Sequence, residues 1–343
     1  MKIAAILAEF NPLHDGHRYI INKARELTGA TYVLVVMSGN FTQRAEPAIM
    51  NKFARAKMAI DAGADAVVEI PTAFATGNAE VFAKAGVKIA TSFENVTHLV
   101  FGIEDETTET LKQIAKQKNI DIKDKLKQGM GFDKARREFL KESFDVEFTP
   151  NNILALEYLR ELDRLDSQAI PIGVKRVPGI SSTAIRRERG FYESETFKSF
   201  GVVALYAMLT QLDTETYNSN IELVNLIKNL QPTSYTQLKR QAPTKRFSVS
   251  RIARLALHCT LGVTKKDIKF LYDNKWLPYT NLLAFKKEFL SELCKNSKTP
   301  VIIRGNKIKP KENAYKKALN DIDKRASDLY NVIQVEGPFP RMP

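Results

Sequence analysis

Residues 2–25 read KIAAILAEFNPLHDGHRYIINKAR and join a short apolar run, a turn and the start of a helix. The apolar run from Ile3 to Ala8 is typical of a buried parallel strand. The turn Glu9–Pro12 ends that strand, and a helical pattern begins at His14–His17. The first turn of a helix has free N–H groups and the positive end of the helix dipole, so this arrangement predicts an anion-binding site.

Two histidines, His14 and His17, stand at this helix start. Each neutral imidazole carries one N–H that can donate to a phosphate oxygen. Gly16 lets a ligand approach the backbone closely. Half of a metal site is the alternative interpretation, but four His and two distant Cys in the whole chain are a poor supply for a zinc site. We therefore expect phosphate binding, with no metal held by the protein alone.

The helix that follows carries four apolar side chains, Tyr19, Ile20, Ala24 and Leu27. Their spacing places them near one another on a helix surface, so we expect them to form its buried face. This face would pack the helix onto the sheet to which the first strand belongs.

The composition indicates a protein with substantial cores and no membrane segment. The chain has 343 residues, enough for two domains, and 44% of them are hydrophobic. No apolar run is long enough for a membrane span, and the N-terminal run is too short for a signal peptide. Two Cys provide no disulfide framework and suit a reducing compartment, so we expect a cytoplasmic location.

Strand and helix patterns alternate over residues 1–105, which predicts an α/β fold with a parallel sheet and helices on both faces. Ligands of such sheets bind at the carboxyl ends of the strands. This rule gathers Glu9–His17, Ser38–Arg44 and Gly102–Asp105 around one crevice. The further strands are expected at residues 31–37, 66–70, 98–101 and 170–176, and helices at 51–62, 78–92 and, with Asn151 or Asn152 as N-cap, 153–162.

A second phosphate-binding motif follows the last of these strands. Ser181 or Ser182 would cap a helix beginning at Thr183, and Arg186 and Arg187 lie in its next turn. Hydroxyls, free N–H groups and guanidinium groups then converge at one helix start, and guanidinium suits bidentate binding of phosphate. An ordinary N-cap is the alternative for this segment alone. Its pairing with the histidine turn favours a nucleotide clamp.

The chain changes character after residue 190. The strand pattern disappears, and helices are expected at residues 200–212, 221–231, 249–261, 265–271 and 282–293. We therefore predict a nucleotide-binding α/β domain at 1–190, a mainly helical basic domain at 191–335 and a disordered tail at 336–343.

The charge distribution predicts a polyanionic partner for the helical domain. The net charge is +13, and the excess lies in the second half of the chain. A solubilising surface is the alternative. One stretch has six basic residues and no acid between them. We expect these residues and the lysines between 286 and 317 to contact nucleic acid. The six are Lys239, Arg240, Lys245, Arg246, Arg251 and Arg254.

The two motifs together resemble the nucleotidylyltransferase superfamily, in which they hold a nucleoside triphosphate on a Rossmann-like sheet. A narrower similarity lies in Glu9–His14, Ser38–Ala48, Arg55–Ala59 and Pro150–Leu154, which resemble the bacterial tRNA(Met) cytidine acetate ligase family. The resemblance is dense over about residues 1–190. It implies that ATP activates acetate as acetyl-adenylate and that N4 of the wobble cytidine of elongator tRNA(Met) is then acetylated.

The resemblance also implies which residues contact ATP. Mg²⁺ would be held mainly by the nucleotide phosphates. The expected partners are ATP, acetate and elongator tRNA(Met), with no DNA and no membrane. The ATP-contacting positions are Leu7, Ala8, Glu9, Phe10, Asn11, Pro12, Leu13, His14, Asp15, Gly16, His17, Arg18, Tyr19, Ile20, Gly102, Asn151 or Asn152, and Arg176, with Ser182 and Thr183 from the second helix start.

Adenylation needs positioning and charge stabilisation rather than a covalent enzyme intermediate. We expect His14, His17 and Arg186 to be catalytic, with Arg176 also holding the polyphosphate. Gln43–Arg44 would read the acyl group or the cytosine, or its loop would close over the nucleotide through backbone alone. Two other functions remain open here, a small-molecule nucleotidylyltransferase and a non-catalytic RNA-binding protein with a relict nucleotide pocket.

Overall fold

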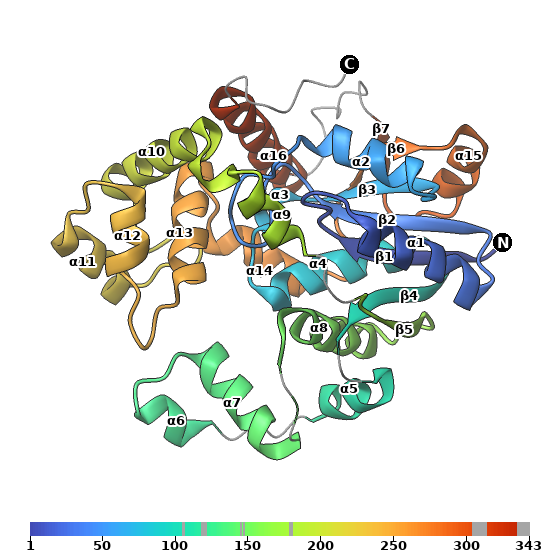
Figure 1. The fold of residues 1–343 in the computed structure, drawn as a ribbon, viewed down its shortest axis with the longest axis horizontal. Helices are drawn as coiled ribbons and strands as arrows, with labels where there is room; N and C mark the ends of the chain where they lie inside the picture. The colour runs from blue at the N-terminus through green and yellow to red at the C-terminus, as the bar shows by residue number, and fades with distance from the viewer. Residues whose placement is uncertain are drawn as a thin grey trace.

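The computed structural model describes residues 1–104, 107–117, 122–144, 146, 148–177, 181–303 and 314–334. Within these residues, strands form a seven-stranded sheet in the order β5-β4-β1-β2-β3-β6-β7 (Figure 1). Neighbouring strands are parallel except β3 and β6, which pair antiparallel. The strands are β1 (Ile3–Ala8), β2 (Tyr32–Ser38), β3 (Ala66–Ile70), β4 (Val96–Ile103), β5 (Ile170–Lys175), β6 (Thr280–Phe285) and β7 (Val301–Ile303).

Helices cover both faces of the sheet, as predicted. Buried side chains of α1 and α2 pack on one face with Ala4, Ile6 and Val35, and α4 and α8 pack on the other with Ala5 and Val36. The helices of the first part of the chain are α1 (Asp15–Thr28), α2 (Lys52–Asp61), α3 (Thr72–Ala75), α4 (Ala79–Thr91), α5 (Thr108–Ala115), α6 (Lys123–Lys127), α7 (Phe132–Phe144) and α8 (Pro150–Arg164).

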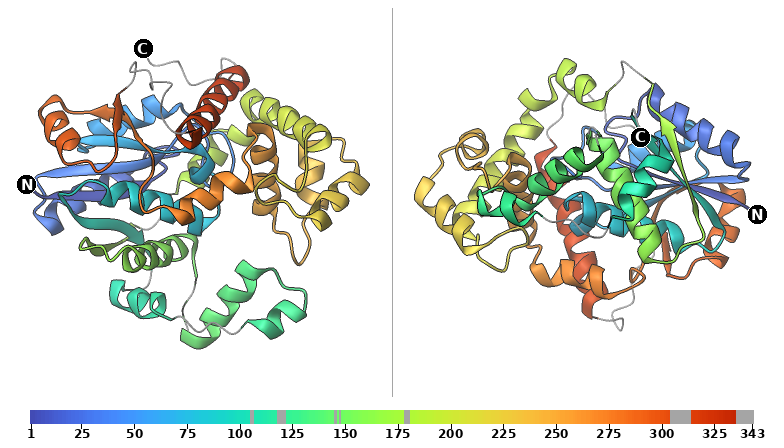
Figure 2. Two further views of the ribbon diagram at one scale, coloured as in Figure 1. Left: turned by 180° about the vertical axis from the view of Figure 1, so that it is seen from behind. Right: turned by 90° about the horizontal axis from the view of Figure 1, so that it is seen from below.

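The later helices form a lobe beside the sheet and return to it. Figure 2 shows α10 to α13 at one end of the molecule, with β6, β7 and α15 at the other. None of the described helices is both long and apolar enough to cross a membrane. These later helices are α9 (Ser182–Glu188), the 3₁₀ turn η1 (Phe191–Glu193), α10 (Glu195–Thr210), α11 (Ile221–Leu230), α12 (Tyr235–Gln241), α13 (Val249–Leu261), α14 (Lys265–Asp273), α15 (Lys287–Lys295) and α16 (Ala314–Ile333).

The expected elements of the first 190 residues are confirmed, with two local corrections. The buried face of α1 is formed by Ile21, Ala24 and Thr28, whereas Tyr19 and Leu27 are exposed. The buried face is the side of α1 that packs on β1, β4 and β2. Helix α8 is capped by the hydroxyl of Thr149, not by Asn151 or Asn152, and begins with a proline at its first position.

The prediction that strands end before residue 190 is wrong, and so is the expected helix at 282–293. β6 occupies the edge of β3, and only residues 287–295 form a helix, α15. The apolar residues of this segment are spaced so that they fit either a helix or a strand. Pairing with an otherwise open sheet edge decides the outcome, because an unpaired edge leaves backbone groups without partners.

A continuous apolar core joins the sheet to the later helices. Phe41 of the β2–α2 loop packs against Phe200 of α10 and Tyr330 of α16. The two-domain division at residue 190 stays a prediction. The expected tail at 336–343, together with Asp105 and Ile180 of the motifs, lies outside the described residues.

The segment between α6 and α7 reaches the lobe. The N–H of Gly131 donates to the carbonyl of Lys245 at 3.3 Å. A Cβ at Gly131 would lie 2.8 Å from the carbonyl oxygen of Arg246, so this close approach requires glycine. Gly129 has φ +80 and makes the turn after α6. These two glycines lie in the break between α6 and α7.

Candidate active site

The turn after β1 is held by two buried arginines. Phe10 is fully buried with φ 48, a left-handed conformation that turns the chain sharply at the end of the strand. The guanidinium of Arg55 in α2 donates to the carbonyl of Glu9, and that of Arg186 in α9 donates to the carbonyl of Asn11 at 2.6 Å. The carbonyls of Glu9 and Asn11, which flank Phe10, are thus each held by an arginine, one from α2 and one from α9.

His14 and His17 lie at the N-terminus of α1 in a defined orientation. His14 is the N-cap, and its Nδ1 accepts from the N–H of Gly16 at 3.1 Å. The Nδ1 of His17 accepts from the N–H of His14 at 3.3 Å, and the two rings stack with centroids 3.8 Å apart. Because Nδ1 accepts in both rings, the proton of each neutral imidazole is on Nε2. Both Nε2–H groups are therefore available as donors.

The two histidines are neutral near pH 7. Burial, with smaller contributions from His14 and Arg176, lowers the pKa of His17 to about 3. Burial and Arg176 also lower the pKa of His14, although Asp15 opposes this. The edge of the His17 ring approaches Phe10, with centroids 4.9 Å apart. The site therefore presents neutral hydrogen-bond donors at a helix start, which suits an anion that brings its own charge.

The second predicted motif packs against the first. Ser181 caps α9, and the hydroxyl of Ser182 donates to the carbonyl of Pro12 at 3.4 Å. Arg186 is buried and also donates to the Thr183 hydroxyl at 3.3 Å. The structure thus brings together motifs about 165 residues apart in sequence. The hydrogen bonds of Arg186 show that it supports the histidine turn, a role that the sequence did not predict. Arg187 is exposed.

The end of β4 lies beside the end of β1, with which it pairs. A Cβ at Gly102 would meet nothing within 4 Å, so the backbone there is open to a ligand. The buried amide of Asn152 accepts from the N–H of Glu104 at 3.1 Å, and Asn151 donates to the Glu104 carboxylate at 3.0 Å. Arg176 pairs with the same carboxylate at 3.7 Å. Of the two asparagines, Asn152 is buried and holds the backbone, and Asn151 is the more exposed.

The loop between β2 and α2 closes the third side. The N–H of Gln43 donates to Glu9 Oε1 at 2.6 Å, and the N–H of Ile49 donates to the Asn11 side chain at 2.8 Å. Arg44 at the tip is exposed. The loop therefore contacts the histidine turn through its backbone, while the side chain of Arg44 is left accessible.

Not every residue of the histidine segment faces the crevice. Arg18 is about half exposed and lies 3.9 Å from the Asp15 carboxylate, which is itself exposed. Tyr19 is exposed, and Ile20 is partly buried. The side chains of Leu7 and Leu13 are buried in the core, so only their backbone can serve a ligand, and Ala8 is partly exposed. The expected ATP contacts thus divide into those that a side chain could make and those that only the backbone could make.

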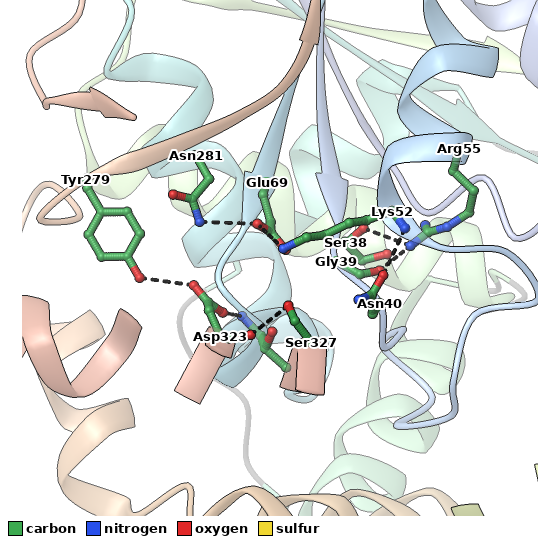
Figure 3. Close-up of polar contacts among 11 residues, drawn as sticks. Ser38, Gly39, Asn40, Lys52, Arg55, Glu69, Tyr279, Asn281, Asp323 and Ser327 are labelled. Atoms are coloured by element: carbon green, nitrogen blue, oxygen red, sulfur yellow. Dashed lines mark hydrogen bonds and ion pairs between the residues drawn. The ribbon is translucent and has the colours of Figure 1, made fainter. Parts of the chain in front are cut away.

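Behind the loop lies a buried polar cluster that the sequence did not reveal (Figure 3). Lys52 Nζ pairs with both oxygens of Glu69, at 2.7 and 2.8 Å, and Asn281 of β6 donates to the same carboxylate. Arg55 also binds the carbonyls of Ser38 and Gly39. A sequence signal existed, because Lys52 and Arg55 share the helical phase of the buried Ala56 and Ala59.

The cluster extends to α16 through Asp323. Its carboxylate accepts from the N–H of Thr72 at 2.6 Å and from the Tyr279 hydroxyl at 3.0 Å. Burial, then the nearby Glu69, raise the pKa of Asp323 to about 6. The C-terminal helix and β6 are thus joined by hydrogen bonds to the carboxyl end of β3, close to the site.

Only some of the six basic residues predicted to bind nucleic acid are exposed at the surface. Arg254 is buried, and Arg251 donates to the carbonyl of Asn218. Lys239 lies over the rings of Phe197 and Tyr235 and pairs with Glu46 of the β2–α2 loop at 3.5 Å. The expectation that Arg254 contacts nucleic acid is therefore wrong, because this side chain is buried. Arg251 and Lys239 are partly exposed but engaged within the protein.

The other three members of that set remain accessible. Arg240, Lys245 and Arg246 are exposed at the end of α12 and in the following loop. Arg246 pairs with Glu222 at 2.6 Å, but both side chains are about half exposed and such pairs are weak. These three residues can meet a polyanion in solution.

Comparisons with known proteins agree in family and fold. A family model described as HIGH Nucleotidyl Transferase matches residues 1–196 and 180–338. Among curated relatives, the tRNA(Met) cytidine acetate ligase of Acetivibrio thermocellus is 30% identical, covering 96% of this chain and 94% of the relative. The protein of the same name from Caldicellulosiruptor saccharolyticus is 34% identical over 96% and 94%. The solved structure of Thermotoga maritima TmcAL bound with alpha-thio ATP has a TM-score of 0.85 at 28% identity, covering 97% of this chain and 95% of that one.

Proposed function

This chain belongs to the tRNA(Met) cytidine acetate ligase family, and we propose that it uses ATP to activate acetate and then acetylates N4 of the wobble cytidine of elongator tRNA(Met). The observation that carries the proposal is the packing of the Ser182–Arg186 helix start against the His14–His17 turn. Two neutral histidine donors and two helix N-termini then face one crevice, as a triphosphate clamp requires. A tRNA substrate would suit a cytoplasmic enzyme.

In the first step, an acetate oxygen attacks the α-phosphate of ATP and pyrophosphate leaves. We assign the Nε2–H groups of His14 and His17 to the oxygens that gain charge at the α-phosphate and the leaving group. Arg176 follows β5 and lies near enough to His14 and His17 to lower their pKa, and it would hold the polyphosphate. The open backbone at Gly102 would line the adenosine. Arg186 would act mainly by holding the Asn11 carbonyl, which fixes the turn that carries the histidines.

Mg²⁺ would arrive with the nucleotide rather than be held by a protein site. Among the described residues, no group of three or more His, Cys, Asp or Glu side chains could hold a metal ion. The nearby Glu104 carboxylate is also engaged, with Asn151 and Arg176. Mg²⁺ that bridges phosphates would neutralise their charge, and it usually keeps several waters.

In the second step, cytidine N4 attacks the acetyl carbon and AMP leaves. An anticodon loop presents its bases partly unstacked, which lowers the free-energy cost of exposing one base to a pocket. Arg240, Lys245 and Arg246 would contact the tRNA backbone, together with exposed lysines of α15 such as Lys287 and Lys295.

One assay tests the proposal. Exchange of labelled pyrophosphate into ATP is measured with and without acetate, and the nucleosides of tRNA(Met) are then analysed by mass spectrometry. Acetate-dependent exchange together with N4-acetylcytidine is expected. Exchange that depends on another small molecule would instead identify a small-molecule nucleotidylyltransferase, and no exchange at all would indicate a non-catalytic RNA-binding protein.

A further inference from the structure

Acetyl transfer to cytidine N4 requires a proton acceptor that the roles assigned above do not supply. When an amine attacks an acyl carbon, the nitrogen gains positive charge and must lose a proton before a stable amide forms. The Nε2 atoms of His14 and His17 carry protons, so both rings act as donors in this arrangement. Arginine does not accept protons. The acceptor must therefore be sought among the carboxylates of the crevice.

Glu9 is the carboxylate in the suitable place. It directly follows β1, and its Oε1 accepts from the Gln43 N–H at 2.6 Å. Within the described part of the chain, this is the one hydrogen bond that the Glu9 carboxylate accepts. Glu9 as a whole residue is only partly buried, so it is not closed off from solvent. By contrast, Glu104 is engaged by Asn151 and Arg176, and Asp15 is exposed next to Arg18.

The sheet order places Glu9 beside the position where a nucleotide is expected to bind. β2 and β3 lie on one side of β1, and β4 and β5 lie on the other, so the order reverses between β1 and β4. Ligands of open α/β sheets bind at such a reversal, which here lies beside Gly102 and the start of α1. The Gln43 loop lies on the opposite side of Glu9. Glu9 therefore lies between the expected nucleotide position and the Gln43 loop.

The surroundings of Glu9 raise its pKa. The charged or titratable groups that face Glu9 are Arg44 of the loop, Arg55 of α2, Arg186 of α9 and Tyr158 of α8. Burial raises the pKa of Glu9 and is the largest effect, while the Gln43 N–H and the three arginines lower it. The net shift is upward, toward the range in which a general base is most effective.

We propose that the Glu9 carboxylate is the general base of acetyl transfer. The N4 lone pair forms a bond to the acetyl carbon, and the bond from that carbon to the phosphate-linked oxygen breaks, with its electron pair leaving on AMP. One N4 proton passes to Glu9, which later releases it to solvent. The assignment rests on the proposed function and deepens it by naming a catalytic residue of the second step alone.

The test separates the two steps in a Glu9→Gln variant. The amide oxygen of Gln can still accept from the Gln43 N–H, so the loop keeps its anchor. Acetate-dependent pyrophosphate exchange is expected to stay within a few-fold of the unmodified protein. The rate of N4-acetylcytidine formation in single-turnover reactions is expected to fall by ~10²–10⁴. In the unmodified protein this rate should rise with pH through the pKa of Glu9, and that limb should vanish in the variant.

Two further variants sharpen the result. Glu9→Asp keeps a carboxylate and should recover part of the transfer rate together with the pH limb. Glu26→Gln, on the exposed side of α1, should leave both steps unchanged. Parallel loss of exchange and transfer in Glu9→Gln, or normal transfer at every pH, would overturn the assignment. Failure of the unmodified protein to show acetate-dependent exchange would overturn the proposed function itself.

Discussion

The side chain of His17 carries a role that can be tested by removing its donor. Its Nε2–H is free because Nδ1 accepts from the backbone of His14. His17→Ala is expected to lower acetate-dependent pyrophosphate exchange by ~10²–10³, the usual effect of losing one transition-state donor. His17→Gln should recover part of this loss, because its amide nitrogen can donate from a similar position.

The pH dependence of the same reaction provides a second check. With a pKa of about 3, His17 is protonated only in acid, so its titration contributes no limb to the exchange rate between about pH 5 and about pH 8. Asn22→Ala, an exposed change on the same helix, serves as the control. Near-normal exchange in His17→Ala would show that the assigned role is wrong.

For single residues, the sequence located the two histidines correctly but did not reveal the residues that hold them in place. The histidines follow a strand, turn and helix start that lie within a few residues of each other, so local pattern was sufficient. Arg55 acts through carbonyls of Glu9, Ser38 and Gly39, which only the folded sheet brings within its reach. Its place on the buried face of α2 was visible in the sequence, but its partners were not.

The attachment of helix α2 to strand β3 depends on the pair Lys52–Glu69. The exposed fractions of the two side chains are 10% and 2%, so solvent screens the pair little. Lys52→Met is expected to lower the free energy of unfolding by ~3–5 kcal/mol, because it leaves the Glu69 carboxylate buried without its cation. Urea denaturation measures this change.

A double variant distinguishes the pair from simple loss of packing. Lys52→Met with Glu69→Leu removes both charges and should be more stable than Lys52→Met alone. Lys57→Met on the exposed face of the same helix should change stability by no more than about 0.5 kcal/mol. A double variant as unstable as the sum of the single variants would show that the two side chains act independently.

The sequence did not predict β6, a strand that joins the sheet from a segment far along the chain. The strands β1 to β5 have local apolar runs and could be placed from the sequence. β6 lies about 210 residues after β3 and contributes Asn281 to the Glu69 cluster, yet its apolar spacing also fits a helix. A long-range pairing of this kind depends on the free edge of β3, which no local window of sequence contains.

For the whole molecule, the net charge of +13 overstates the basic surface. Within the stretch that the sequence singled out, Arg254 is buried and Lys239 is used to hold the β2–α2 loop to α12. Net charge can be counted from sequence, but the direction in which each side chain points depends on helix packing. The exposed remainder, Arg240, Lys245 and Arg246, lies where the loop after α12 meets the α6–α7 segment.

Binding of tRNA(Met) should therefore depend steeply on salt, through a limited set of phosphate contacts. The logarithm of the association constant is expected to fall linearly with the logarithm of salt concentration, because each neutralised phosphate releases a counterion. Arg240→Ala and Lys245→Ala should each weaken binding and reduce the slope by about 1. Lys57→Ala, an exposed basic residue on α2, should leave the slope unchanged. Fluorescence anisotropy over a salt series measures these slopes, and a flat response in the unmodified protein would show that the exposed basic residues face solvent.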